Sequence, residues 1–261
     1  MGRFLWATLF IFLVFLGLTA HAAEPLKMCV DDWPPYEYKE NYQIEGICVK
    51  AAKAVLERMG HGECSLVSAN WERCLNNVRI GDDHLALTAV KTSEREQYAW
   101  YPDEPLTTAY RVFFVKTDRR KVLRYRSLED LNGRRIGLVK GFHYPPEIVA
   151  YAEKHATIRY AADPTTNFHL LLDDRVDFVF EDLAPGMYIL EQLHAKDKAI
   201  PLLDSVLEEE PLYVIFSKER VDKVFVDRFS KELERYKQTD EYKKIFSQYD
   251  PWVKLPHENE N

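Results

Sequence analysis

The chain lacks the short motifs that mark common hydrolases and nucleotide-binding enzymes. Its 261 residues contain no GxSxG, no HExxH and no P-loop glycine pattern. Basic residues are also in deficit, because 35 lysines and arginines stand against 42 acids and the formal net charge is -7. Removing residues 1–22, whose only charge is Arg3, makes the net charge -8. General hydrolase chemistry is therefore disfavoured, and nucleic acid binding is not expected.

Long apolar runs are missing everywhere except at the start of the chain. There, Phe4–Leu18 is almost unbroken apolar sequence that follows Arg3, and Ala20-His21-Ala22 fits a small-x-small cleavage site. The pattern predicts an export signal over residues 1–22, cleaved near Ala22. An uncleaved membrane anchor is the alternative, but the run is short for a full span and a cleavage pattern follows it directly. No cysteine lies at the cleavage site, so a lipid anchor is not expected there.

Cysteine is scarce and confined to the first third of the chain. The four residues are Cys29, Cys48, Cys64 and Cys74, and an even number in an exported protein predicts two disulfides. Three pairings are possible. We favour Cys48 with Cys74, at two predicted helix starts, and Cys29 with Cys64, on two predicted strands. A zinc site is disfavoured because no CxxC or closely spaced histidine pair accompanies these cysteines.

Hydrophobic residues make up 46% and aromatic residues 13% of the chain, enough for one large domain or two small ones. The periodicity predicts a strand-helix-strand-helix-strand unit twice, which is typical of parallel sheets covered on both faces. The first unit comprises residues 27–30, 47–59, 64–68, 71–80 and the apolar run after His84; the second comprises 135–139, 147–154, 157–160, 165–173 and 176–180. Strands 110–116 and 212–216 and helices 221–236 and 239–249 complete the prediction. Two similar halves indicate two lobes.

The stretch HLALTAVKTSER, residues 84–95, places an arginine where a buried strand runs into a polar loop. Open α/β folds bind ligands at the carboxyl edge of the parallel sheet. Arg95 is planar and permanently charged, which suits capture of a carboxylate, and Thr92 and Ser93 add small donors and acceptors. The alternative is a surface arginine in the first turn of a helix that Thr92 or Ser93 caps.

Five stretches together resemble the family 3 bacterial extracellular solute-binding proteins, the periplasmic receptors of polar amino acid ABC importers. They are WPPYEYKENYQIEGICVKAAKAVLERMG, KTSEREQYAWYPDEPL, SLEDLNGRRIGLVKG, DDRVDFVFEDLAPGMYIL and KELERYKQTDEYKKIFSQY. The resemblance implies an α/β, two-lobe periplasmic binding protein of type II, the Venus-flytrap fold, with a mostly parallel sheet flanked by helices in each lobe. The implied division is residues 24–109 plus 212–261 for lobe 1 and 110–211 for lobe 2, with hinge crossings near 108–111 and 210–213.

The resemblance also implies roles for particular residues. Arg95 matches the arginine that grips the ligand α-carboxylate, and Asp182, in FVFED, matches the acid that receives the α-ammonium. Tyr36 matches the aromatic residue that covers the ligand side chain, and Trp71 begins a helix that faces the same cleft. The alternatives are a helix cap for Asp182 and rigid loop packing for Tyr36 and Trp71.

The sequence departs from the family pattern in two places. Val90 stands where a serine or threonine often precedes the arginine, although Thr88 and nearby carbonyls remain. Gly-Phe142-His143-Tyr144-Pro-Pro, residues 141–146, stands where Gly-Thr-Thr often opens a helix, so hydroxyls and two amide donors are lost. Lobe 2 is therefore expected to grip the ligand differently, with His143 or Tyr144 as the new donor.

The resulting hypothesis is a monomeric periplasmic protein without cofactor or metal that binds a small polar solute, an amino acid or related compound, for an ABC permease in the inner membrane. One alternative is a dehydratase that resembles the periplasmic cyclohexadienyl dehydratases and uses Glu181, Asp182 and His143 as acid and base groups. Another is a ligand sensor that signals to a membrane receptor. Transport and sensing use the same closure, so the sequence does not separate them.

Overall fold

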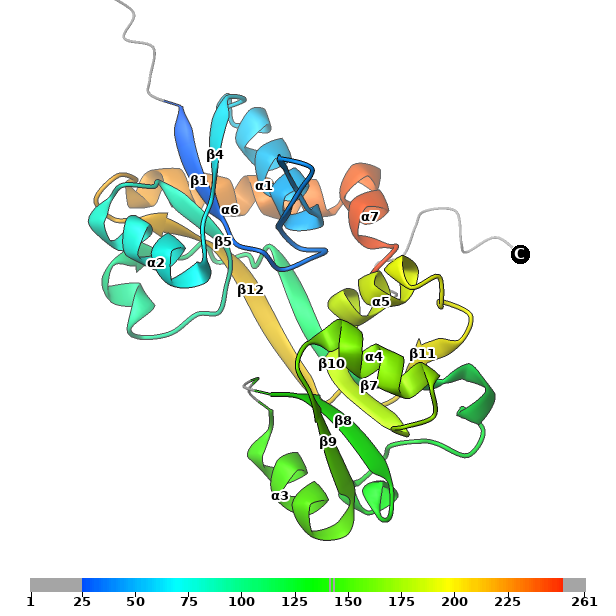
Figure 1. The fold of residues 1–261 in the computed structure, drawn as a ribbon. Coiled ribbons are helices and arrows are strands. Elements are labelled where there is room, and N and C mark those ends of the chain that lie inside the picture. The colour runs from blue at the N-terminus through cyan, green and yellow to red at the C-terminus, as the bar shows by residue number, and fades with distance from the viewer. Residues whose placement is uncertain (1–24, 141, 143, 251–261) are drawn as a thin grey trace, which may run out of the picture.

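A computed structural model describes residues 25–140, 142 and 144–250, and it forms two lobes joined by two long strands (Figure 1). These strands are β7 (Thr107–Lys116) and β12 (Glu208–Ser217), and each runs from one lobe into the other. The predicted export signal lies outside the described residues. Within the described ranges, no helix is both long and apolar enough to cross a membrane.

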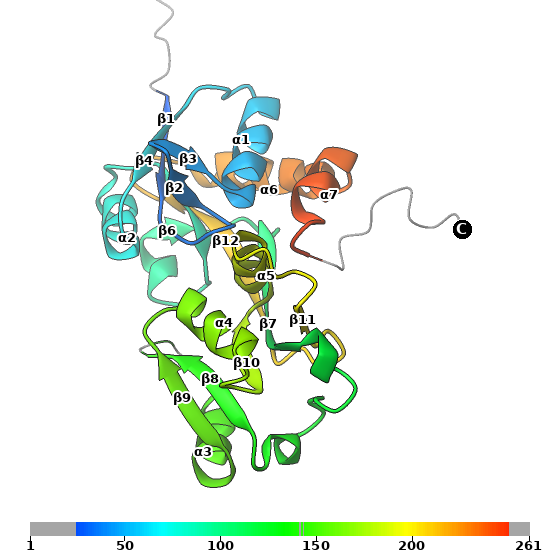
Figure 2. The ribbon, with the colours of Figure 1, turned by 45° about the vertical axis from the view of Figure 1, so that its right-hand side comes forward.

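Lobe 1 contains the first predicted repeat. Its elements are β1 (Leu26–Val30), α1 (Ile47–Arg58), β4 (Cys64–Ser68), α2 (Trp71–Ile80) and β5 (Leu85–Ala89), with the hairpin β2 (Tyr38–Glu40) and β3 (Gln43–Glu45), the short strand β6 (Ala99–Trp100), α6 (Lys223–Lys237) and α7 (Asp240–Phe246). The strand order is β4-β1-β5-β12, in which the first three strands are parallel and β12 is antiparallel. Helices α1, α6 and α7 lie together on one face of this sheet and α2 lies on the other (Figure 2).

Lobe 2 repeats this arrangement. Its elements are β8 (Arg135–Val139), α3 (Pro146–His155), β9 (Thr157–Ala161), α4 (Pro164–Leu172), β10 (Phe178–Asp182), α5 (Leu183–Gln192) and β11 (Ala199–Pro201). The strand order β9-β8-β10-β7 again has three parallel strands beside one antiparallel crossing strand. The predicted repeat and mostly parallel sheets are therefore confirmed. The lobe boundaries within β7 and β12 stay a prediction, because both strands belong to both lobes.

Local chemistry explains why the predicted elements form. The five residues of β5 are all buried, as expected for a strand in a covered parallel sheet. Helix α2 begins after Asn70, whose side chain accepts a hydrogen bond from the Arg73 amide at 3.0 Å, and ends at Gly81 in the left-handed conformation with φ 80°. The two crossing strands pair with each other, because residues 107–111 lie opposite 208–212.

Helix α5 was not predicted, because Pro185 and Gly186 interrupt the helical pattern near its start. Pro185 lies in the first turn, where the missing amide hydrogen has no intrahelical acceptor. Gly186 lets the helix approach β7, since a Cβ built on it would lie 2.3 Å from the Phe114 ring.

Gly186→Ala is expected to lower the free energy of unfolding by about 1 to 3 kcal/mol, because the Phe114 ring is fully buried and must shift to admit the methyl group. Urea denaturation measures the loss. Gly62→Ala is the matched control, because its Cβ would come no closer than 3.8 Å to another residue. Equal stability of both variants would contradict close packing of α5 on β7.

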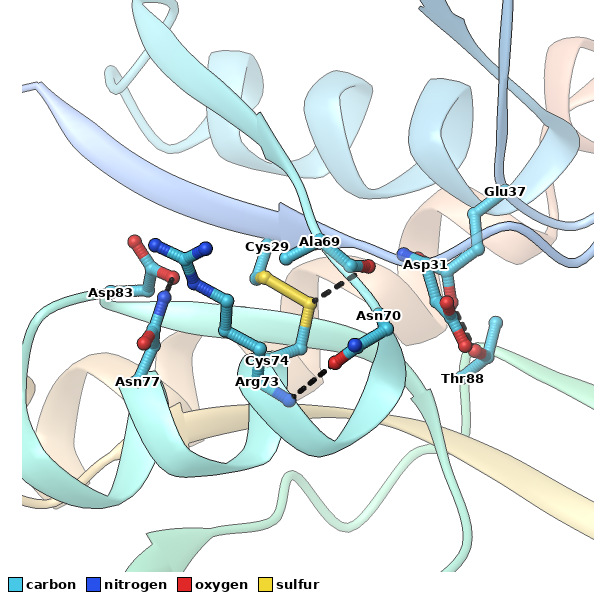
Figure 3. Close-up of a disulfide and its surroundings, with 10 residues drawn as sticks. All are labelled: Cys29, Asp31, Glu37, Ala69, Asn70, Arg73, Cys74, Asn77, Asp83 and Thr88. Atoms are coloured by element: carbon cyan, nitrogen blue, oxygen red, sulfur yellow. Dashed lines mark hydrogen bonds between the residues drawn. A yellow bond between two sulfur atoms is a disulfide. The ribbon is translucent and has the colours of Figure 1, made fainter.

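The predicted disulfide pairings are wrong. Cys29 is bonded to Cys74 (Figure 3). Cys48 and Cys64 are free thiols. Neighbouring residues of a strand point to opposite faces, so Met28 faces the core beside α1 while Cys29 faces α2. Cys48 lies on α1, on the far face of the sheet from Cys74, and the two cannot meet.

The pairing of Cys29 with Cys64 fails because of strand register. Strands β1 and β4 run parallel with Cys64 opposite Leu26, whereas Cys29 lies opposite Val67. An offset of three residues along a strand is about 10 Å. A disulfide requires Cα atoms within about 7 Å, so this register excludes the bond.

Candidate ligand-binding cleft

A cleft of about 580 Å³ opens between the lobes. It is lined from lobe 1 by Asp31, Asp32, Trp33, Trp71, Thr88, Val90, Thr92 and Arg95, from lobe 2 by Phe142, Tyr144, Phe180, Glu181 and Asp182, and by Arg111 of the crossing strand β7. Apart from Arg111, which lies within β7, these positions follow or lie near the ends of β1, β4, β5, β8 and β10, so the cleft lies at the carboxyl ends of parallel strands in both lobes. Ligands bind at this edge in open α/β sheets.

Arg95 places a positively charged guanidinium in the lobe 1 wall of the cleft. Its Nη1 donates a hydrogen bond to the Val90 carbonyl oxygen at 2.8 Å, and its guanidinium carbon lies 5.4 Å from the centre of the Trp71 ring. These two contacts fix the plane of the guanidinium. Among the described residues, no carboxylate forms an ion pair with Arg95, so its charge is available to an anion that enters the cleft.

Asp182 ends β10 on the opposite wall and is held by Arg111. The Arg111 Nε donates to Asp182 Oδ1 at 3.3 Å, while its Nη1 donates to Glu208 Oε2 at 2.7 Å. Burial raises the pKa of Asp182, and the charge of Arg111 limits the rise. Asp182 precedes α5, but its side chain makes no capping hydrogen bond. These contacts therefore differ from those expected if Asp182 were only a helix cap.

Glu181 adds a second acid beside Asp182. Its Oε1 accepts a hydrogen bond from the Asp182 amide at 3.0 Å, and the residue is buried. Burial raises the pKa of the Glu181 carboxyl, and the negative charge of Asp182 raises it further. The pair is thus arranged to hold one negative charge more readily than two.

Of the residues predicted to bind ligand, six line the cleft: Arg95, Asp182, Trp71, Thr88, Val90 and Phe142. Tyr36 does not, because it is buried in the lobe 1 core with its ring edge-on to Trp33. The chain reverses at the two prolines, so the Tyr36 amide donates back to the Trp33 carbonyl at 3.0 Å. Trp33 therefore lines the cleft in place of Tyr36. His143 lies outside the described residues.

Arg111 is one of the cleft residues that the sequence did not reveal, and it is the cation among them. It lies within a strand of aromatic and β-branched residues, which gives no local sign of a binding role. Its position is set by register, because Arg111 lies opposite Asp182 in the β7–β10 pair and opposite Glu208 in the β7–β12 pair. Only an alignment of homologous sequences with charged residues at positions 111, 182 and 208 would have suggested the cluster.

Behind the lobe 1 wall, a buried glutamate joins two segments that line the cleft. The Thr88 hydroxyl donates to Glu37 Oε1, and the Asp31 amide donates to Oε2 at 3.1 Å (Figure 3). Thr88 adopts a left-handed backbone conformation with φ 52°, which is rare for a β-branched residue and found where surrounding contacts enforce it. Glu37 supplies such a contact, and burial raises its pKa to about 8.

Glu37→Gln is expected to stabilise the protein increasingly as the pH rises from 5 to 8. The Glu37 pKa is about 8 in the folded protein against 4.5 ordinarily, so the folded state retains a proton that the unfolded chain has lost. Glu37 therefore contributes to the free energy of unfolding of the wild type at low pH. This contribution falls by up to about 1.4 kcal/mol per pH unit as the pH rises from 5 to 8. Glutamine does not titrate and keeps both contacts, because its oxygen accepts from the Asp31 amide while its nitrogen donates to the Thr88 hydroxyl, which reverses that hydrogen bond.

Urea denaturation of both proteins at several pH values measures the difference. Glu57→Gln, at an exposed position of α1, is the control and should follow the wild type. A constant difference between Glu37→Gln and the wild type over this range would contradict the burial of a neutral carboxyl.

The cleft offers no evident metal centre. Across the ranges that the structure describes, no three histidine, cysteine, aspartate or glutamate side chains are grouped to hold a metal ion. The cleft instead combines one unpaired cation, an acid pair and aromatic rings. Such a set can hold a small molecule that carries both charges.

Comparison with known proteins places these features in a family. An arginine-binding extracellular protein of Bacillus subtilis is 25% identical over 223 residues, which span 82% of this chain and 81% of that protein. A substrate-binding domain assigned to an amino acid ABC transporter of Streptococcus pneumoniae has a TM-score of 0.71 at 19% identity, covering 87% of this chain and 99% of that one. An ancestral amino acid-binding protein described as a precursor of cyclohexadienyl dehydratase has a TM-score of 0.60 at 23% identity, covering 86% and 94%.

The structural likenesses establish the two-lobe fold of periplasmic binding proteins. The family model of the bacterial extracellular solute-binding proteins, family 3, matches residues 26–251, which is nearly all of the described chain. The chain therefore belongs to family 3 of the bacterial extracellular solute-binding proteins.

Proposed function

We propose that this protein captures an amino acid in the cleft between its lobes and delivers it to an ABC importer in the inner membrane. The observation that carries the proposal is Arg95, a fixed guanidinium without an ion-pair partner among the described residues, opposite the acid Asp182. A zwitterion needs one cation and one anion in a small desolvated site. The relatives named above support the choice of an amino acid.

In this proposal, each wall of the cleft binds one charged group of the amino acid. Arg95 receives the α-carboxylate, and Asp182 receives the α-ammonium. Trp71, Thr88, Val90 and Phe142 surround the remainder of the ligand, and Tyr36 acts only by supporting Trp33. Because the ligand contacts both lobes only when they approach each other, binding stabilises the closed form.

The charge of the cleft favours an amino acid with a cationic side chain. Four acids and two arginines line it, and Arg111 is already paired with Asp182 and Glu208. Asp31 and Asp32 have no ion-pair partner among the described residues and lie on the lobe 1 wall, away from the Asp182 pair. They are the groups we assign to the ligand side chain.

A thermal-shift screen of residues 23–261 against the common amino acids, amines and small organic acids tests the proposal. A ligand at a hundred times its dissociation constant stabilises the folded state by about 2.7 kcal/mol. In a chain of this size the melting temperature then rises by several degrees. Arginine or lysine is expected to give the largest rise. No rise with any amino acid would sink the proposal.

The proposal also assigns the protein to the periplasm, as a monomer without catalytic activity. A dehydratase would need an acid or base close to the reacting bond, and the Glu181–Asp182 pair is the group that could act so. Incubation with prephenate and arogenate separates the two functions, because product formation would favour the enzyme. A membrane receptor that co-purifies with the protein would favour sensing over transport.

A further inference from the structure

The second lobe has Gly-Phe-His-Tyr-Pro-Pro at residues 141–146, in place of the Gly-Thr-Thr with which this family often holds the ligand carboxylate. The segment at residues 141–146 has two prolines that carry no amide hydrogen, and its Tyr144 hydroxyl accepts a hydrogen bond from the Val139 amide at 2.7 Å, which holds the oxygen in place and leaves its own proton to donate. The Tyr144 ring also packs edge-on against Phe180. In the described part of this segment, the tyrosine is therefore held in the lobe 2 wall, and its hydroxyl is one neutral donor there.

Among the described residues that line this side of the cleft, Arg111 is the charged donor. Its Nε and Nη1 are bonded to Asp182 and Glu208, but no described group accepts a hydrogen bond from Nη2. The side chain retains 27% of its exposure and lines the cleft. Two of the three guanidinium nitrogens thus contact acids, and the third, Nη2, has no acceptor among the described residues.

The register of β7 and β10 gives this arginine a particular relation to Asp182. The two residues lie directly opposite each other on antiparallel strands, so a cation and an anion stand side by side at the base of the cleft. The α-ammonium and α-carboxylate of an amino acid are likewise adjacent. The pair is therefore complementary to an amino acid head group laid against it, with each charge facing its opposite.

We propose that Arg111 is a further ligand-binding residue, which supplies the lobe 2 side of the carboxylate grip through its free Nη2. When the lobes close, the α-carboxylate lies between Arg95 and Arg111 while the α-ammonium contacts Asp182. This assignment rests on the proposed function.

A different role for Arg111 would be to hold Asp182 in position without touching the ligand. The two roles predict different results with ligands that differ only in the carboxylate. Loss of a positioning residue would weaken every ligand that uses Asp182. Loss of a carboxylate-binding residue would weaken only ligands that carry a carboxylate, and a ligand without one would bind as before or more tightly, because Asp182 loses its partner.

The experiment compares L-arginine with agmatine, its decarboxylated amine, by calorimetric titration of the wild type, Arg111→Gln and Arg111→Lys. Arg111→Gln is expected to bind arginine 10- to 100-fold more weakly, the effect of one charge-assisted hydrogen bond, and to bind agmatine within threefold of the wild type or more tightly. Arg111→Lys keeps the charge but lacks the separate Nη2 donor. It should give an intermediate loss of affinity for arginine.

The control is Arg119→Gln, which removes an arginine paired with Asp174 and Asp177 outside the cleft and should change neither affinity. Equal weakening of arginine and agmatine in Arg111→Gln would overturn the assignment in favour of positioning, and unchanged affinity for both would exclude either role. If the wild type binds only neutral amino acids, L-glutamine and 4-aminobutanamide replace the pair. If the wild type binds no amino acid, the proposed function fails together with the role of Arg111. That result differs from the other two contrary outcomes, in which the wild type binds and only the role of Arg111 is excluded.

Discussion

Arg95→Ala is expected to weaken amino acid binding by about 2 to 5 kcal/mol, or roughly 30- to 5,000-fold. The reason is that the closed cleft would hold the ligand carboxylate away from water without its cation. The guanidinium is already oriented by the Val90 carbonyl and the Trp71 ring, so little side-chain freedom is lost when it binds. Calorimetric titration with the amino acid that stabilises the wild type most gives the loss directly.

Two further variants make this result interpretable. Arg95→Lys keeps the charge but not the planar group, and it should recover only part of the affinity, because an ammonium cannot bond both carboxylate oxygens as the guanidinium does. Arg235→Ala, on the exposed face of α6, should leave binding unchanged. Wild-type affinity in Arg95→Ala would remove Arg95 from the site.

Removal of the Cys29–Cys74 disulfide, as the double variant Cys29→Ala with Cys74→Ala, should lower the free energy of unfolding by about 4 kcal/mol. The bond closes a loop of 45 residues, and the chain-entropy model gives this value for that length. The bond joins β1 to α2, whose first residue is Trp71 of the cleft. Urea denaturation measures the loss, and weaker ligand binding should accompany it.

Cys64→Ala is the control, because Cys64 is a free, half-buried thiol, and its loss should cost less than about 1 kcal/mol. Thiol titration of the unfolded, unreduced protein should give two thiols per chain. Four thiols would show that the disulfide is absent, and none would restore the prediction of two disulfides.

The sequence by itself determined those features that depend on near neighbours in the chain. Apolar spacing located the two repeats, and residue types such as Asn70 and Gly81 placed the ends of α2. The position of Arg95 after a buried strand placed it at the ligand edge, because parallel strands all end there. The crossing strands were also located, although the start of β12 was missed because charged residues such as Glu208 do not look like strand sequence.

Only the tertiary structure decided which distant residues meet. The face on which Cys29 lies and the register that sets Cys64 opposite Leu26 determined the disulfide. Likewise, the register of β7 against β10 brought Arg111 to Asp182. A shift of one residue in a strand reverses the face of every side chain, and the energy that selects the register comes from packing across the whole sheet. Local sequence therefore specifies the strands, whereas the packed sheet specifies the contacts in the cleft.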